Sequence, residues 1–168
     1  MTEVKVIFFD ATGTLIHLPR GVGFHYAGVA ARFGWKADAD SVGRAFRALW
    51  SEMPPPEITR APKVDDDRSW WRALVERVLD VTGAPGDFDR EGYFAAVYDE
   101  FAQPGVWALY PETIDVLDAL AARFQLNVLS NFDRRLRTVL DHLGVCDRFE
   151  HLIISSEAGA DKPDPWIF

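Results

Sequence analysis

The sequence predicts an α/β fold in which a helical insert interrupts a parallel sheet. Three short apolar runs have the length and composition of buried strands, and helical patterns lie between the later ones. More than a hundred residues separate the first run from the second. A crossover between parallel strands needs only about a dozen residues, and long structureless loops are rare. The intervening stretch must therefore contain structure of its own.

The first predicted strand covers residues 4–9. Its apolarity is nearly continuous, which is typical of a strand covered on both faces in a parallel sheet. Asp10 follows it directly, and the small residues Ala11, Thr12, Gly13 and Thr14 come next.

The insert is predicted to be helical. Four stretches between residues 22 and 102 have helical patterns: 23–34, 40–52, 69–83 and 90–102. In the third, apolar side chains including Trp70 and Trp71 form a wide stripe at helical spacing, and Gly83 is placed to end the helix. The Pro-rich, charged stretch 53–68 is predicted to be a surface loop within the insert.

Two further strands are predicted at 126–129 and 152–154. Helices are predicted over 111–124 and over 133–144, the latter with Asp133 as N-cap and Gly144 as its stop. This order of elements favours a parallel sheet. We therefore predict a sheet domain from residues 1–16 and 105–168, and a helical domain from 17–104.

Composition limits the function classes. The chain of 168 residues has a formal net charge of -8, which argues against nucleic acid and anionic membranes as partners and favours a small-molecule substrate. Cys146 is the only cysteine, so no intramolecular disulfide forms. We find no signal peptide and no apolar run of the roughly 20 residues that span a bilayer, and we expect a cytoplasmic protein. The oligomeric state is not predicted.

Polar side chains follow all three predicted strands. Asp10 comes after the first, Ser130 and Asn131 after the second, and Lys162 after the third. The carboxyl ends of parallel strands share one sheet edge, where ligands of open α/β sheets bind. A carboxylate there is a competent nucleophile, a lysine offsets developing negative charge, and a serine hydroxyl donates to a phosphoryl oxygen. Gly13 allows the backbone to approach an anion closely.

The motifs FFDATGTL, VLSN and KPDPWIF, in this order, resemble those of the haloacid dehalogenase-like (HAD) hydrolase superfamily. The resemblance spans the whole chain. It implies a Rossmann-like core with an inserted helical cap, which corresponds here to residues 17–104. The stretch WWRALVERVL further resembles a branch of uncharacterised members related to the human HDHD-type proteins.

The resemblance implies a role for each motif residue. Asp10 is implied to be the nucleophile and a Mg²⁺ ligand, and the backbone carbonyl of Thr12 a second Mg²⁺ ligand. Ser130 is implied to bind the phosphoryl group and Lys162 to stabilise the covalent intermediate. Gly13, Thr14 and Asn131 complete the expected substrate-binding set, with Thr14 orienting the loop.

Position 12 departs from the family pattern, because phosphatases of the superfamily usually carry an acid/base Asp there. Acid–base help is typically worth about 10²–10⁴-fold, and a threonine cannot supply it. We therefore expect a slow Mg²⁺-dependent phosphatase acting on a small phosphorylated metabolite, unless a cap residue such as His25 or Tyr26 supplies the proton. The alternatives are a 2-haloacid dehalogenase, whose halide leaves without a proton, and a non-catalytic protein that binds a metabolite or partner.

The superfamily's fourth motif, an acidic pair on a later strand, is not found in the sequence. We therefore expect the sequence to be a fragment whose core and Mg²⁺ site are incomplete at the C-terminal end. The first strand is then expected to become an exposed apolar edge of the sheet.

Overall fold

The computed structural model describes residues 4–168 and consists of two compact units. The first contains the sheet and comprises the chain up to His17, Glu57–Asp66 and Trp107–Phe168. The second is helical and comprises Leu18–Pro56 and Asp67–Val106. Each unit has its own apolar core, and we describe each by itself.

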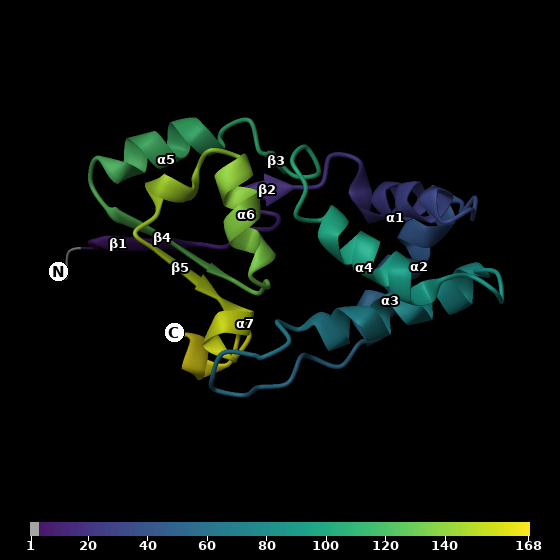
Figure 1. Cartoon of the computed structure of the whole chain (residues 1–168). Helices are drawn as coiled ribbons and strands as arrows, with labels where there is room; N and C mark the ends of the chain where they lie inside the picture. The colour runs from purple at the N-terminus through teal and green to yellow at the C-terminus, as the bar shows by residue number, and fades with distance from the viewer. Residues whose placement is uncertain (1–3) are drawn as a thin grey trace. The chain divides into compact units, whose positions relative to one another are not determined.

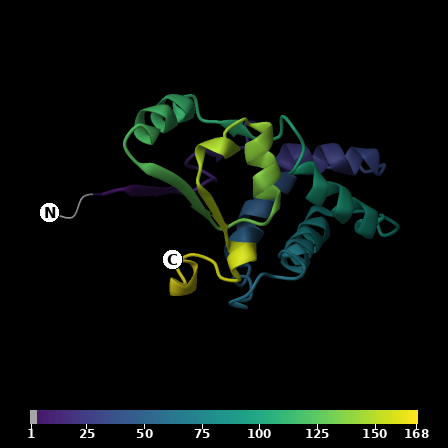
Figure 2. The same ribbon diagram turned by 60° about the vertical axis from the view of Figure 1, so that its left-hand side comes forward.

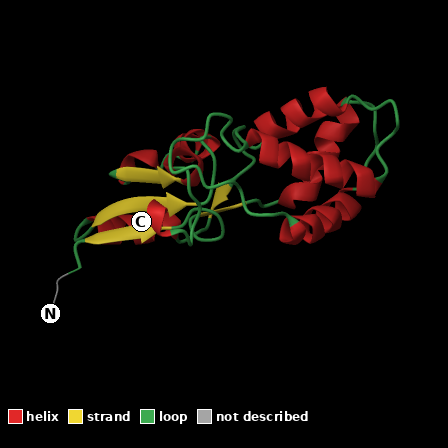
Figure 3. Ribbon diagram, turned by 90° about the horizontal axis from the view of Figure 1, so that it is seen from below, coloured by secondary structure: helices red, strands yellow, loops and turns green. Residues whose placement is uncertain are grey.

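The sheet unit is built on three parallel strands in the order β1-β4-β5 (Figure 3). Their bounds are Val6–Phe9 for β1, Gln125–Ser130 for β4 and His151–Ile154 for β5. All three begin or end within two residues of the predicted strands. The structure therefore confirms the α/β class with a parallel sheet.

Helices α5 (Thr113–Ala121) and α6 (Arg135–His142) lie beside this sheet (Figures 1 and 2). Their apolar side chains, among them Leu117, Leu136 and Leu140, are fully buried against strand residues such as Val128. Burial of this kind is the main favourable term in folding, about 25 cal/mol per Å² of apolar surface. The predicted helix stop at Gly144 is confirmed by its left-handed φ of 68°.

Smaller elements complete the unit. A short antiparallel pair, β2 (Ile16–His17) with β3 (Ala108–Leu109), joins the two ends of the insert and has no signal in the sequence. Helix α7 (Ser155–Ala158) follows β5, and two 3-10 turns lie at Cys146–Arg148 and Pro165–Ile167.

Strand β1 differs from its prediction, because only one of its faces is covered in the described part of the chain. Ile7 and Phe9 pack against the core, whereas Val6 and Phe8 are 38% and 52% exposed. β1 pairs with β4 on one side only, so it lies at the edge of the described sheet. Strand β4, between two neighbours, is buried from Leu126 through Ser130.

The helical unit contains four helices whose bounds follow the predicted stretches: α1 (Gly21–Arg32), α2 (Ala39–Glu52), α3 (Arg68–Thr82) and α4 (Arg90–Glu100). Asp38 and Asp89 cap α2 and α4 by accepting backbone N–H bonds, and Gly83 ends α3 with φ of 75°. Trp70 and Trp71 pack against the core of this unit. No helix in residues 4–168 is long and apolar enough to cross a membrane.

The stretch Glu57–Asp66 differs from the predicted plan. The sequence places it in a surface loop of the insert, yet it packs with the sheet unit. The backbone N–H groups of Thr59 and Arg60 both donate to the carbonyl of Gly159, at 2.8 and 2.9 Å. These long-range hydrogen bonds have no local sequence pattern, so only the tertiary structure places the segment.

Candidate functional site

The site begins at Asp10, the first residue after β1. Its side chain is 45% exposed, and its Oδ1 accepts a hydrogen bond from the backbone N–H of Ala11 at 2.9 Å. The hydrogen-bonded strand β1 fixes the backbone up to Phe9, so the Asp10 carboxylate has a defined position at the end of the strand.

Lys162 meets this carboxylate. Its Nζ lies 2.9 Å from Asp10 Oδ1 and donates to the carbonyl of Leu129 at 2.8 Å. The structure therefore brings together the ends of β1 and β4 and the segment that follows β5. An ammonium this close can neutralise negative charge that develops at the carboxylate during a reaction.

Asn131 fixes the loop that carries Lys162. Its Oδ1 accepts from the Lys162 backbone N–H at 2.7 Å, and its Nδ2 donates to the Lys162 carbonyl at 3.0 Å. Through these two hydrogen bonds, Asn131 holds the backbone of Lys162 in place. The predicted contact of Asn131 with substrate stays a prediction. Ser130 ends β4, is buried, and lies between Leu129 and Asn131 in the sequence; its predicted role stays a prediction.

The loop after Asp10 turns tightly around one backbone carbonyl. The carbonyl of Ala11 accepts N–H bonds from Thr14, Leu15 and Ile16, at 3.2, 2.8 and 3.0 Å. Gly13 has a φ of 82°, a conformation that side-chain-bearing residues rarely adopt. Thr12 and Thr14 lie exposed on this loop, where both are reachable from solvent.

Two groups that take part in the site have no signal in the sequence. The carbonyl of Leu129 holds the Lys162 ammonium, and a backbone acceptor has no residue-type signal. Asp161, directly before Lys162, pairs with Lys63 from Glu57–Asp66 at 3.6 Å. Nothing in the spacing of residues 63 and 161 could have predicted that contact.

The two side chains expected as possible proton donors lie buried, whereas Cys146 is half-buried. His25 and Tyr26 lie in the helical unit, with His25 Nδ1 3.3 Å from Glu100 Oε1 and Tyr26 in the core. Cys146 lies in the sheet unit, where burial, with a contribution from Asp141, raises the pKa of its thiol to about 11. Its thiolate is therefore scarce at neutral pH.

The described residues do not by themselves make the expected magnesium site. Residues 4–168 contain no group of three or more His, Cys, Asp and Glu side chains placed to hold a metal ion. Asp10 Oδ1 already has two donors, Lys162 and the Ala11 N–H. Mg²⁺ prefers near-octahedral oxygen coordination, which one carboxylate and the Thr12 carbonyl do not supply by themselves.

Comparison with known proteins decides the family. The sequence model of the haloacid dehalogenase-like hydrolases matches residues 4–168. The chain belongs to this family. Haloacid dehalogenase-like hydrolase domain-containing protein 3 of Mus musculus is 30% identical over 171 residues, which cover 99% of this chain and 67% of that protein. The rhythmically expressed gene 2 protein of Drosophila melanogaster is 27% identical over 100% of this chain and 68% of its own length.

Solved structures of HAD-type proteins have the same fold. A defluorinating L-2-haloacid dehalogenase aligns with a TM-score of 0.76 and 22% identity, over 99% of this chain and 66% of that one. The L-2-haloacid dehalogenase from Xanthobacter autotrophicus aligns with a TM-score of 0.64 and 20% identity, over 98% of this chain and 62% of that one. The chain therefore spans about two thirds of the length of these HAD relatives.

Proposed function

We propose that the chain carries the nucleophilic centre of a hydrolase that forms a covalent intermediate on Asp10. The contact of 2.9 Å between Lys162 Nζ and Asp10 Oδ1, at the carboxyl edge of the sheet, carries this proposal. Two donors hold Oδ1, which leaves Oδ2 as the attacking oxygen. The ammonium then stabilises the anionic transition state and draws an anionic substrate to an acidic protein.

The substrate class that we favour is a small phosphorylated metabolite. Attack of Asp10 Oδ2 on phosphorus forms one P–O bond and breaks the P–O bond to the leaving alkoxide, which takes a proton from solvent water. Water then attacks phosphorus and releases phosphate and the free carboxylate. Family membership supports this reading, and the exposed, cation-paired carboxylate supplies the nucleophile it needs.

Thr12 favours a second candidate, a 2-haloacid dehalogenase. A threonine cannot protonate a leaving group, and halide needs no proton to leave. In that reaction Asp10 Oδ2 forms a C–O bond as the carbon–halogen bond breaks, and halide leaves with the electron pair. Water then hydrolyses the resulting ester and releases the hydroxy acid.

Isotope transfer distinguishes the two candidates. An acyl phosphate hydrolysed at phosphorus leaves the carboxylate oxygens in place, whereas an alkyl ester hydrolysed at its carbonyl carbon transfers an oxygen from water to the carboxylate. The experiment incubates the protein in H₂¹⁸O with p-nitrophenyl phosphate or with 2-chloropropionate. Mass spectrometry then reads the peptide that contains Asp10 and the released phosphate.

For a phosphatase we expect label in phosphate only, and for a dehalogenase label in Asp10. Asp10→Asn should reduce either turnover to background, while Asp87→Asn, at an exposed loop position of the helical unit, serves as the matched control. Adding EDTA tests the magnesium dependence that the family resemblance implies. Turnover that survives Asp10→Asn would contradict the proposed nucleophile.

A further inference from the structure

The segment Glu57–Asp66, which we call the strap, is fastened to the sheet unit along its length (Figure 1). At one end, Thr59 and Arg60 donate to the carbonyl of Gly159. In the middle, the N–H of Lys63 donates to the carbonyl of Ser156 at 2.8 Å. The strap therefore runs beside α7 and the chain that leads to Lys162.

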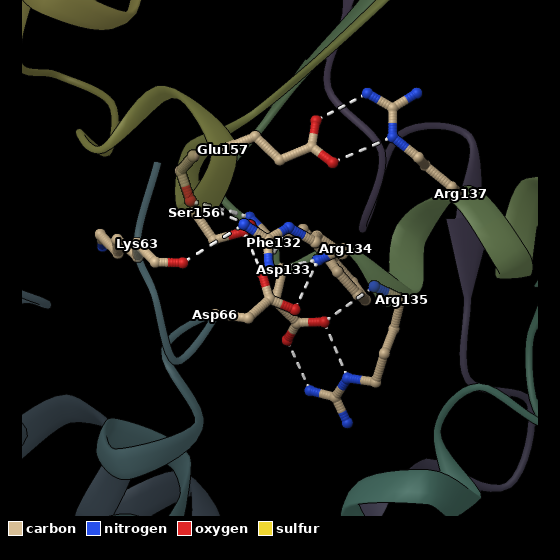
Figure 4. Close-up of polar contacts among 10 residues, drawn as sticks. Lys63, Asp66, Phe132, Asp133, Arg134, Arg135, Arg137, Ser156 and Glu157 are labelled. Atoms are coloured by element: carbon tan, nitrogen blue, oxygen red, sulfur yellow. Dashed lines mark hydrogen bonds and ion pairs between the residues drawn. The ribbon is translucent and has the colours of Figure 1, made fainter. Parts of the chain in front are cut away.

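The far end of the strap is fixed by Asp66. Its carboxylate accepts from Ser156 Oγ at 2.5 Å and from the backbone N–H of Arg134 at 3.1 Å (Figure 4). Burial raises the pKa of Asp66, and these hydrogen bonds oppose that shift by stabilising the ionised form. A carboxylate that is partly desolvated but multiply hydrogen-bonded is a specific anchor, because its donors must all be in place.

The fit between strap and sheet unit is close. A Cβ added at Gly159 would lie 2.1 Å from the carbonyl oxygen of Ala61 and 2.6 Å from Thr59 Oγ1. No real side chain tolerates such distances, so the strap reaches this position only because residue 159 is glycine. This observation is independent of the hydrogen bonds and supports the same placement.

Lys63 is the buried cation of the strap. It is only 5% exposed, and its Nζ lies 3.6 Å from Asp161 Oδ1. That oxygen is itself buried and receives no hydrogen bond from any residue of the described chain. Since a buried carboxylate oxygen without compensation is costly, the Lys63 ammonium stabilises Asp161 at this position. Asp161 immediately precedes Lys162.

We propose that Lys63 is a positioning residue, which acts through Asp161 to hold Lys162 against Asp10. The proposal rests on the proposed function of Asp10 and Lys162. Asn131 fixes the backbone of residue 162 from one side, and the Lys63–Asp161 pair fixes the residue before it. A segment of the insert thereby takes part in setting the geometry of the nucleophile. Displacing a catalytic group by about 1 Å costs on the order of 10²-fold in rate.

The experiment measures the reactivity of the Lys162 side chain toward an acetylating reagent, and it does not depend on enzyme turnover. The protein is treated with a limiting acetylating reagent, and mass spectrometry gives the acetylation rate of Lys162 relative to Lys36, an exposed lysine of the helical unit. The variants are Lys63→Met, Asp161→Asn, the double variant and Lys63→Arg. We expect the first three to accelerate acetylation of Lys162 by roughly three- to tenfold, because a loosened ammonium is freed from Asp10 and Leu129.

The double variant separates positioning from simple electrostatics. If the two charges act on Lys162 only through space, Lys63→Met slows acetylation of Lys162, because it removes a repelling positive charge. Asp161→Asn accelerates acetylation, because it removes an attracting negative charge. In the double variant the two effects on the rate cancel. If Lys63 acts by positioning, all three variants accelerate acetylation of Lys162. Lys63→Arg keeps the charge, so its acetylation rate stays near that of the unmodified protein. The double variant also removes both charges of the Lys63–Asp161 pair together, so it retains the fold where a single variant loses it.

Asp10→Asn makes failure of this inference distinguishable from failure of the proposed function. If Asp10→Asn does not alter acetylation of Lys162, the contact between the two groups is absent in solution, and both proposals fall. If Asp10→Asn accelerates it while the Lys63 and Asp161 variants show the cancelling pattern or no change, only the positioning proposal is overturned.

Discussion

At the scale of the residue, position 12 is where the proposed phosphatase lacks an acid. Asp10 and Lys162 supply a nucleophile and a positive charge at 2.9 Å, but neither is an acid for a leaving alkoxide. Thr12 lies exposed on the loop after Asp10, two residues from the nucleophile. The rate of the proposed phosphatase should therefore depend strongly on how easily the leaving group departs without being protonated.

Thr12→Asp tests this dependence. We expect it to raise kcat/KM for an alkyl phosphate by on the order of 10²-fold, because a carboxylic acid at this position protonates the alkoxide. p-Nitrophenyl phosphate should gain far less, because nitrophenolate leaves without a proton. Steady-state phosphate release measures both, and Thr12→Asn controls for size. Equal gains on the two substrates would show that the missing acid does not limit the reaction.

At the scale of the element, the strap depends on the conformation and the space at Gly159. This residue ends α7 with φ of 75°, and the strap carbonyl of Ala61 occupies the place where a Cβ would lie. Gly144, which follows α6, has a similar φ of 68° but no atom within 4 Å of the added Cβ. Both glycines adopt a positive φ, but only Gly159 has the backbone of Ala61 beside it.

Gly159→Ala and Gly144→Ala form a matched pair. Each introduces a residue with positive φ, at a cost on the order of 1 kcal/mol. Only Gly159→Ala should also release the strap, so trypsin cleavage after Arg60 and Lys63 should accelerate by about tenfold or more in that variant alone. Timed proteolysis with peptide mass spectrometry gives these rates. Equal protection in both variants would mean that the strap does not rest on residue 159.

At the scale of the whole molecule, the described sheet presents an apolar edge strand. Phe8 is 52% exposed on β1, which pairs only with β4. Exposed apolar edges are templates for association between chains, and a charged residue on such a strand discourages it. The acidic net charge of -8 opposes association but does not cover this strand.

Phe8→Lys should therefore reduce aggregation of the chain on heating, while its free energy of unfolding changes by less than about 0.5 kcal/mol. Phe9→Lys is the matched change on the covered face, where Phe9 contacts Phe149 with ring centroids 6.3 Å apart. It should destabilise the protein by about 3 kcal/mol or more, because it buries a charge and opens the core. Light scattering and urea unfolding measure the two effects, and identical behaviour of the two variants would contradict the described burial of β1.

Local patterns predicted most elements of the fold. The helices of the insert, the three strands and the stops at Gly83 and Gly144 follow from apolar periodicity and backbone preference, which act over a few residues. Asp133 shows the limit of such reasoning at a helix start. α6 begins at Arg135, one residue later than an N-cap at 133 implies, although Asp133 Oδ1 does accept the Arg135 N–H at 3.1 Å.

The sequence alone determined the α/β class, the family and the set of polar residues that follow the strands. Each depends on the order and spacing of residue types along the chain. Only the tertiary structure decided that Lys162 contacts Asp10 and Leu129, that Asn131 holds the backbone of Lys162, and that Lys63 pairs with Asp161. Those contacts join residues that are far apart in the chain, and they form only when burial and hydrogen bonding bring the segments together.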